Sequence, residues 1–484
     1  MWYASFMTDA ITRTDDLMAS LGLEVYRVGG SVRDELLGRP AKDADYMVRG
    51  VNLADLIGQL NRVPLRCKLL TDREGRKLGV RIAQGKHHPI EVTLPRKEVS
   101  TGPGHRDFDI VLDPNLPLAE DAKRRDFTFN ALYRRIDGQP GAVVLDPTAC
   151  GLYDLEHKFI RTTHPDSFRD DPLRILRALR FVSTLGYELS INTQQEMERH
   201  ADAVDGLTAA GVSGTVYDEF CKLLMGEFPH RALYVAAHTG VLSTVFPELR
   251  PMIGFDQGSR YHDLTTDEHT FKALETAAHV EAPLRVRWAL LFHDCGKPET
   301  AWVGKDGNKH YYAKWVDDPF APYQIEDHEV VGERLWRTAA ERLNVPKSLR
   351  EDVARLVRDH MVPCVSPIKL TKIRRWRVRY GDEFLRDLFM HRMCDLTGKG
   401  AANKAHLTNI GTAELARKAA VRDGVPASVK DLAVDGRDAQ AVNLCGRDIG
   451  ERLALVLDEV VVDPTPMKLG RDWQLQRLAG GGAV

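Results

Sequence analysis

Several features of specialised proteins are missing from this 484-residue sequence. Its seven cysteines are dispersed and form no CxxC pair, so the sequence indicates neither a zinc knuckle nor a disulfide framework. No apolar run approaches the roughly 20 residues of a membrane span. The N-terminal stretch lacks the basic start and apolar core of a signal peptide. We therefore expect a cytoplasmic protein with no membrane association.

A strong charge of one sign is also missing, because the formal net charge is −2. The chain as a whole is no polycation, so any nucleic acid must be bound through local basic patches. The hydrophobic fraction of 43% and the charged fraction of 28% are ordinary for a globular protein. No internal repeat or low-complexity tract is present. The composition therefore leaves the function to be found in local motifs.

The length exceeds what one compact core accommodates, so we expect a multidomain α+β protein. Short apolar runs bounded by Gly and Pro predict strands at "VYRVGG", "DYMVRG", "GVRIA", "HPIEVTL" and "GAVVLDP". Helices are expected at "SVRDELLG" and around 52–61, and helical spacing dominates beyond about 151. The predicted domains are a mixed domain over 20–150, helical domains over 151–255 and 256–400, and a mixed segment over 401–484.

A glycine turn and an arginine follow the first predicted strand. Gly29 and Gly30 let backbone amides approach a phosphate, and the start of the following helix adds partial positive charge. Arg33 lies one turn into that helix, where its guanidinium could pair with a phosphate. A strand, two glycines and a helix are a weak signal alone, and a simple tight turn explains them equally well.

Two aspartates flank Ala44 at the start of the next predicted strand. On a strand, Asp43 and Asp45 project to one face, while Ala44, Tyr46 and Val48 face the core. Paired carboxylates at this spacing suit Mg²⁺, which takes oxygen ligands and retains substrate phosphates. Two solvated acids at a strand end are the simpler alternative for an isolated DxD.

The combination GGxVRDxLLG followed by DxDY resembles the head domain of template-independent nucleotidyltransferases of the polymerase-β superfamily. The nearest resemblance is to the bacterial-type (class II) CCA-adding tRNA nucleotidyltransferases and their poly(A) polymerase relatives. It implies a mixed-sheet head followed by a helical neck, with Asp43 and Asp45 catalytic and holding Mg²⁺. Gly30 and Arg33 would hold the nucleotide. Glu91 is a weak candidate for the third carboxylate often found in this superfamily.

Two further segments match the family in order. "KRRDFTFNALY" resembles its RRDFTxNAL segment, in which the second arginine, here Arg125, contacts the incoming nucleotide. "RDDPLRILRALRF" resembles the segment that selects the base, and its matching positions are Asp171, Arg174 and Arg177. The two arginines lie away from the apolar stripe of the helix, so we expect them to face a cleft, where an acceptor and donors could read a base edge. Asp171 also suits a plain helix cap.

A second set of residues follows the spacing of HD-domain phosphohydrolases. "FHDCGK" places adjacent His and Asp at the end of an apolar helix, and further ligands precede and follow it in order. The resemblance implies one or two divalent ions, and the donors suit Mn, Fe, Co, Ni or Zn without choosing among them. The implied ligands are His269, His293, Asp294, His328, His360 and Asp395.

Together the resemblances imply an enzyme that adds CCA to the 3′ end of tRNA from CTP and ATP. Some HD-bearing relatives also have phosphohydrolase or 2′,3′-cyclic phosphodiesterase activity. The alternatives are a poly(A) polymerase and a metal-dependent phosphohydrolase whose head only binds RNA. The basic stretch "KLTKIRRWRVRYG" could contact the tRNA backbone or form a solvated helix face. We expect 401–484 to support RNA binding, and the oligomeric state stays open.

Overall fold

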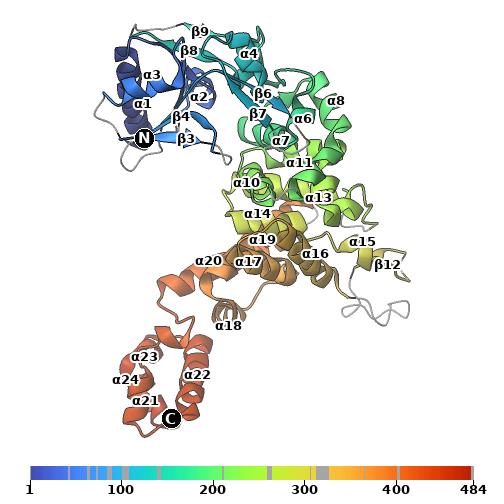
Figure 1. Cartoon of the computed structure of the whole chain (residues 1–484). Coiled ribbons are helices and arrows are strands. Elements are labelled where there is room, and N and C mark those ends of the chain that lie inside the picture. Colours follow the sequence, from blue (N-terminus) through green and yellow to red (C-terminus); the bar gives the residue numbers. More distant parts are fainter. Residues whose placement is uncertain are drawn as a thin grey trace. The chain divides into compact units, whose positions relative to one another are not determined.

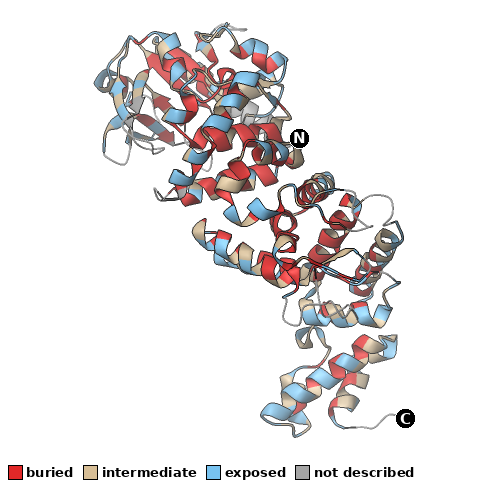
Figure 2. Cartoon of the chain, turned by 90° about the vertical axis from the view of Figure 1, so that its right-hand side faces the viewer, coloured by how far each residue is buried: buried red, intermediate tan, exposed pale blue. Residues whose placement is uncertain are grey.

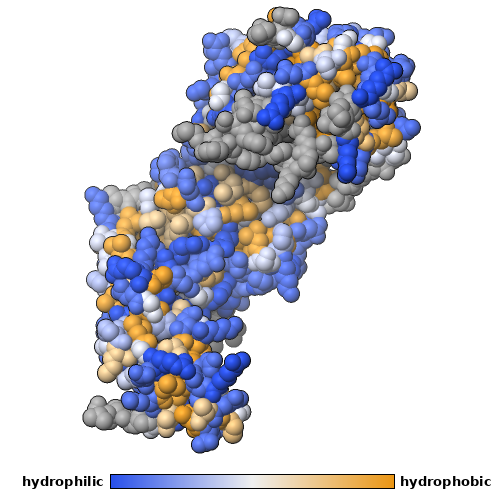
Figure 3. Space-filling model, turned by 90° about the vertical axis from the view of Figure 1, so that its left-hand side faces the viewer, coloured by the Kyte–Doolittle hydropathy of each residue, from blue (hydrophilic) through white to orange (hydrophobic). Residues whose placement is uncertain are grey.

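The chain divides into two compact units, Met1–Val245 and Phe246–Val484, whose elements are labelled in Figure 1. Among the residues that the structure describes, no helix is long and apolar enough to cross a membrane. Figure 3 shows a surface on which hydrophilic side chains alternate with small hydrophobic areas. This computed structural model describes residues 2–41, 44–62, 66–71, 75–83, 90–100, 108–138, 143–209, 212–258, 264–305, 307–311, 326–364, 366–399 and 404–480.

A seven-stranded mixed sheet forms the centre of the first unit, as predicted. The pair β2–β5 is parallel, and every other pairing in this sheet is antiparallel. Strands β6 (Arg96–Ser100) and β7 (Phe108–Leu112) make a separate antiparallel pair. In spatial order the sheet is β3 (Arg66–Thr71), β4 (Lys77–Ala83), β5 (Ile90–Thr93), β2 (Asp45–Arg49), β1 (Glu24–Val28), β8 (Tyr133–Ile136) and β9 (Val144–Leu145).

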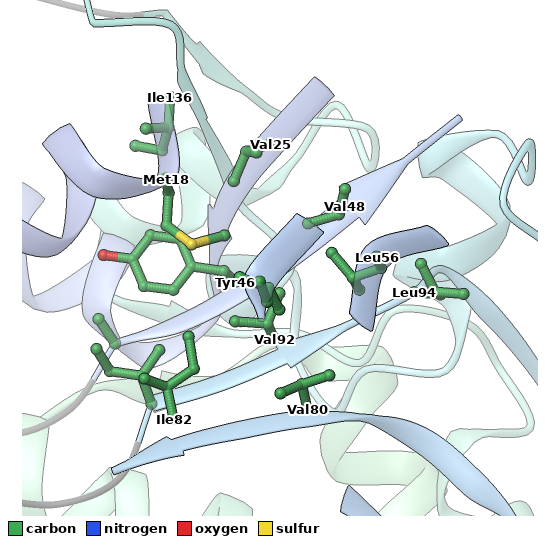
Figure 4. Packing of buried hydrophobic residues seen from close by; sticks show 13 residues of the cluster. Met18, Val25, Tyr46, Val48, Leu56, Val80, Ile82, Val92, Leu94 and Ile136 are labelled. Atoms are coloured by element: carbon green, nitrogen blue, oxygen red, sulfur yellow. The ribbon is translucent and has the colours of Figure 1, made fainter. Parts of the chain in front are cut away.

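Helices cover the sheet and explain the pattern of strand β2. The side chains of Tyr46 and Val48 are fully buried, as the alternation predicted, in a cluster with residues of α1, α3 and the neighbouring strands (Figure 4). Met47 points the other way and is also buried, beside Tyr26 and Tyr133. Both faces of the sheet are therefore covered beyond Asp45. The head helices are α1 (Trp2–Ser20), α2 (Gly30–Leu36), α3 (Leu53–Leu60) and α4 (Leu118–Lys123).

The rest of the first unit is almost entirely helical. Helix α7 (Leu173–Leu185) buries its apolar stripe, and Gly186 ends it with φ +71°. A glycine suits that left-handed position, as the sequence predicted. Two short strands, β10 (Phe159–Ile160) and β11 (Glu188–Leu189), pair in parallel beside the helices. The other helices are α5 (Gly151–Glu156), α6 (Ser167–Asp170), α8 (Ile191–Arg199), α9 (Asp205–Ala209), α10 (Ser213–Leu224), α11 (Pro229–His238) and α12 (Val241–Val245).

Where its residues are described, the second unit is helical apart from one short hairpin, β12 (Trp302–Val303) and β13 (Lys309–His310). Figure 2 shows its buried residues on the sides of the helices that face one another. A smaller apolar cluster, including Val434, Leu453 and Leu478, holds the C-terminal helices together. Its helices are α13 (Thr266–His279), α14 (Leu284–Phe292), α15 (Lys297–Thr300), α16 (His328–Arg342), α17 (Lys347–Asp359), α18 (Leu370–Tyr380), α19 (Asp382–Gly398), α20 (Lys404–Arg422), α21 (Gly436–Ala441), α22 (Arg447–Val462), α23 (Pro466–Leu469) and α24 (Arg471–Leu478).

Two candidate active sites

The exposed carboxylate of Asp45 stands at the start of a central strand of the head. Asp45 pairs with Val28 of β1 on one side and with Glu91 of β5 on the other. Glu91, the weak candidate for a third carboxylate, is thus the strand neighbour of Asp45, and its Oε1 lies 2.6 Å from Arg81 Nη2. Asp43, the other predicted catalytic carboxylate, lies outside the described residues.

The glycine turn after β1 brings two predicted arginines together. Gly29 has φ +75°, a conformation that favours glycine. A Cβ atom on Gly29 would lie 3.4 Å from Arg125 Nη1, and one on Gly30 would lie 3.5 Å from Arg33 Nη2. Both guanidinium groups therefore lie against the turn. Gly30, Arg33 and Arg125, three of the predicted nucleotide-binding residues, therefore meet at this turn. Val28, the last residue of β1 before the turn, pairs with Asp45.

A chain of hydrogen bonds links this turn to helix α7. Arg33 Nη1 donates to Asn130 Oδ1 at 2.8 Å, and Asn130 Nδ2 donates to Asp126 Oδ1 at 3.0 Å. Arg177 Nη2 donates to the second oxygen of Asp126 at 2.5 Å. Burial alone would raise the pKa of Asp126, but the cation of Arg177 holds it well below its usual range. The carboxylate therefore stays charged and ties Arg33 to Arg177.

A second buried acid positions Arg125. Asp121 Oδ2 lies 3.4 Å from Arg125 Nη2 and accepts a hydrogen bond from the Tyr133 hydroxyl at 2.7 Å. Arg125 Nε donates to the same hydroxyl at 3.0 Å. Burial and the neighbouring carboxylate raise the pKa of Tyr133 to about 12, so the phenol keeps its proton. Sequence reasoning missed Asp121, Asp126 and Asn130, although the last two stand inside the "KRRDFTFNALY" segment.

The predicted base-selecting residues are differently exposed. Asp171 is buried, and its Oδ1 accepts a hydrogen bond from the Leu173 amide at 3.0 Å, although Pro172 and not Asp171 is the N-cap of α7. The side chain of Arg177 is 34% exposed. Arg174 is only 6% exposed, and its guanidinium donates to Ser167 Oγ at 2.8 Å and to the Arg124 carbonyl at 2.7 Å. It therefore points into the protein, where those two acceptors satisfy it.

The second unit brings together all six predicted HD ligands in two adjoining groups. In the first group, His269 Nε2 lies 2.9 Å from Asp395 Oδ1, and His293 Nε2 lies 3.1 Å from Asp294 Oδ2. Helices α13 and α19 carry His269 and Asp395, while His293 and Asp294 follow the end of α14. All four residues are buried.

The second group shares Asp294 with the first. His328 Nε2 and His360 Nε2 lie 3.3 Å apart, and Asp294 Oδ1 is 3.6 Å from the former and 3.9 Å from the latter. His328 begins α16, and His360 follows α17. One carboxylate therefore faces both groups, an arrangement suited to two adjacent ions.

The surroundings of the imidazoles fit metal ligation. His293 Nδ1 lies 2.7 Å from the Leu290 carbonyl, and His360 Nδ1 lies 2.7 Å from the Val357 carbonyl. Donation from Nδ1 to a carbonyl leaves Nε2 to act as a ligand. Among the described residues, His293 Nε2 finds no hydrogen-bond partner of good geometry. The buried donor set therefore fits a divalent transition metal.

Two lysines that the sequence analysis did not predict pair with the carboxylates of the cluster. Lys297 Nζ lies 2.7 Å from Asp294 Oδ2, and Lys399 Nζ lies 2.9 Å from Asp395 Oδ1. Burial lowers the pKa of His328 to about 4, outweighing the effect of Asp294. Burial would also lower the pKa of His293, but the nearby carboxylates of Asp294 and Asp395 raise that pKa to about 9. The "HDCGK" and "MCDLTGKG" stretches held the signal for both lysines.

Three parts of the chain match known protein families. Residues 25–161 match the poly A polymerase head domain, and residues 186–253 match a probable RNA- and SrmB-binding site of polymerase A. Residues 266–397 match the HD domain. The first match contains Asp45, the glycine turn and Arg125, and the third contains all six clustered ligands.

Solved structures share the fold. A Bacillus stearothermophilus CCA-adding enzyme in complex with CTP has a TM-score of 0.58 at 23% identity, covering 94% of this chain and 93% of that one. A Thermotoga maritima CCA-adding enzyme complexed with tRNA has a TM-score of 0.59 at 19% identity, covering 97% and 95%. The fold prediction, a nucleotidyltransferase head followed by helical neck and HD regions, is confirmed.

Curated relatives share sequence over most of the chain. A multifunctional CCA protein of Nitrosococcus oceani is 35% identical over 350 residues, which cover 70% of this chain and 74% of the relative. One of Acidovorax ebreus is 34% identical over 343 residues, covering 70% and 72%. The chain belongs to the multifunctional CCA protein family.

Proposed function

We propose that this protein adds CCA to the 3′ end of tRNA in the cytoplasm, using CTP and ATP and releasing pyrophosphate. One observation carries the proposal: Asp45 stands beside the glycine turn against which Arg33 and Arg125 lie. A carboxylate and two guanidinium groups around a glycine turn suit a nucleoside triphosphate and its counter-ion. Membership of the CCA family supports the same reaction.

The roles follow from the chemistry of each group. The terminal 3′ hydroxyl of tRNA attacks the α-phosphate of the nucleotide, and pyrophosphate leaves. Asp43 and Asp45 would hold Mg²⁺, which when bound activates the hydroxyl and stabilises the leaving group. Arg33 and Arg125 bind the triphosphate and ribose side, since guanidinium groups pair well with phosphate. Gly30 leaves room for this approach.

Base selection belongs to Asp171, Arg174 and Arg177 in this proposal. Arg177 is the residue best placed to reach a base, because its side chain is partly exposed and Asp126 fixes one edge of its guanidinium. Asp171 Oδ1 accepts a hydrogen bond from the Leu173 amide, and its Oδ2 lies 3.7 Å from Arg174 Nε, so this carboxylate lies next to the second predicted arginine. Arg174 is committed to Ser167 and Arg124, so its contact with a base requires that those hydrogen bonds open.

The test for the head site compares two aspartates. Asp45→Asn should lower CMP incorporation into a tRNA without its CCA end by about 100-fold or more, the range for losing a key electrostatic group. Asp109→Asn, an exposed carboxylate on β7, is the matched control and should keep wild-type rates. Equal rates for Asp45→Asn and wild type would contradict the proposal. Long A-tails on arbitrary RNA, without use of CTP, would instead indicate a poly(A) polymerase.

We also propose that the HD cluster hydrolyses phosphate esters, including 2′,3′-cyclic phosphates. The six converging ligands favour this second activity. At a phosphate diester such as a 2′,3′-cyclic phosphate, water adds at phosphorus, one P–O bond breaks, and the products are a monoester and a free hydroxyl. We propose that the cluster holds a divalent transition metal, because imidazole and carboxylate donors suit Mn, Fe, Co, Ni and Zn alike. His293→Ala should abolish both metal content and hydrolysis, while a metal-free wild-type protein with unchanged activity would contradict the assignment.

A further inference from the structure

A cavity of about 390 Å³ opens beside the HD cluster and has no role in the functions above. Residues of α16, α17, α18 and α19 line it, together with the segment that follows α17. Its volume falls within the roughly 300–1,000 Å³ typical of small-molecule sites. The residues that matter for its chemistry are Glu329, Arg358, Met361, Trp376, Tyr380 and Arg392.

Arg392 connects the cavity to the metal-ligand cluster. It is only 9% exposed, and its Nη1 lies 2.5 Å from Asp395 Oδ2. Its Nε has no hydrogen-bond partner among the residues that the structure describes. The side chain also lines the cavity, and a phosphate oxygen is a natural acceptor for a guanidinium group.

The lining of the cavity includes two aromatic side chains. Trp376 and Tyr380 are one turn apart on α18 and both line the space. The basic residues of this helix are partly used inside the chain, since Arg377 bonds Asp382 at 2.8 Å and Arg375 lies 3.3 Å from Asp458. Helix α18 therefore contributes aromatic side chains to the cavity lining, while some of its basic side chains pair with acids of the chain.

Glu329 completes the lining next to the cluster. Its carboxylate lies 3.3 Å from His328 Nδ1, and the residue is buried. A carboxylate is an acceptor for hydroxyl groups such as those of a ribose. The cavity thus presents a cation for phosphate and an acceptor for hydroxyls, both beside the cluster, and two aromatic side chains for a base.

We propose that this cavity is the nucleoside-binding subsite of the HD site. The base packs against Trp376, the ribose faces Glu329, and Arg392 holds the phosphate beside Asp395. The inference rests on the proposed phosphohydrolase function of the cluster. It makes Trp376 the residue that distinguishes nucleoside phosphates from other phosphate esters, and Arg392 a phosphate-positioning residue.

Two substrates separate the parts of this proposal in the full-length protein supplied with Mn²⁺. Adenosine 2′,3′-cyclic monophosphate carries a nucleoside, and bis(p-nitrophenyl) phosphate does not. Trp376→Leu should raise KM for the first about tenfold, the scale of base stacking on an aromatic side chain, and leave kcat and the second substrate unchanged. Arg392→Lys should raise KM for both substrates. Trp473→Leu, in the C-terminal cluster, is the matched control and should change neither.

Equal effects of Trp376→Leu on both substrates, or no effect on either, would overturn the subsite. Titration of adenosine 2′-monophosphate, followed by tryptophan fluorescence, gives a readout that needs no turnover. Quenching in wild type and Trp473→Leu that is lost in Trp376→Leu supports the subsite, and its absence from wild type overturns it. A wild-type protein that hydrolyses neither substrate contradicts the phosphohydrolase function, and the titration then decides the subsite separately.

Discussion

At the scale of single residues, the carboxylate of Asp121 pairs with two arginines of the head, Arg124 and Arg125. It is fully buried, and its Oδ1 accepts a hydrogen bond from Arg124 Nε at 2.8 Å. Burial by itself would raise its pKa, but Arg124 and Arg125 hold the pKa well below the usual range. Folding therefore favours the charged form of Asp121, and this carboxylate holds the guanidinium of Arg125 in place through their ion pair.

Asp121→Asn should lower the free energy of unfolding by about 3 kcal/mol at pH 7, because it leaves buried cations without their carboxylate. A carboxyl with a depressed folded pKa stabilises fully above its unfolded pKa of about 3.9 and loses this contribution as the pH falls through the folded value. The difference from wild type should stay constant between pH 7 and about 5, then narrow below about 4. Urea unfolding at each pH measures it, and a difference that does not change with pH would contradict the assignment.

At the scale of helices and strands, local sequence patterns predicted some elements and missed others. Strands β1, β2, β4, β5 and β9 were predicted because apolar runs or alternation mark them. Strand β3 was not, because its burial pattern has no regular alternation for the sequence to reveal. Asp45 and the HD ligands were predicted from motifs, whereas the buried orientation of Arg174 follows from its hydrogen bond to the Arg124 carbonyl, 50 residues away. A side chain's partners across such separations are set by packing and are not encoded in local spacing.

Element packing also explains Gly296, which is separated from the His-Asp pair by Cys295. A Cβ there would lie 2.3 Å from the His328 carbonyl and 2.9 Å from the Gly332 amide of α16. Gly296→Ala should therefore push α16 and His328 away, lowering the free energy of unfolding by about 2–3 kcal/mol and reducing bound metal. Gly411→Ala, with nothing within 4 Å on α20, is the control and should be neutral or slightly stabilising. Thermal unfolding and metal analysis measure both, and a metal content equal to wild type in Gly296→Ala would contradict the packing argument.

At the scale of the whole molecule, the two candidate sites lie in separate compact units. Asp45, Arg33 and Arg125 belong to Met1–Val245, and the HD ligands belong to Phe246–Val484. Each site draws its side chains from its own core, so the two activities should be separable. The sequence predicted this division of chemistry from two motif sets, but not the acids that hold the arginines.

Asp45→Asn should therefore lose nucleotide transfer by about 100-fold or more and keep cyclic-phosphate hydrolysis. His293→Ala should lose hydrolysis and keep transfer within about twofold, since the ligand set lies outside the transfer unit. Parallel kinetics on the two variants and wild type check this. Loss of both activities from either variant, in protein whose unfolding transition matches wild type, would contradict separate sites.

The most direct measurement sequences the 3′ ends of a tRNA lacking CCA after incubation with the wild-type protein. CTP alone should add two C residues, ATP alone should add nothing to this end, and both together should end the RNA in CCA. Addition that stops at CC, or only A added to an end already carrying CC, would restrict the account to part of the reaction. No extension at all, from folded protein supplied with Mg²⁺, would contradict it.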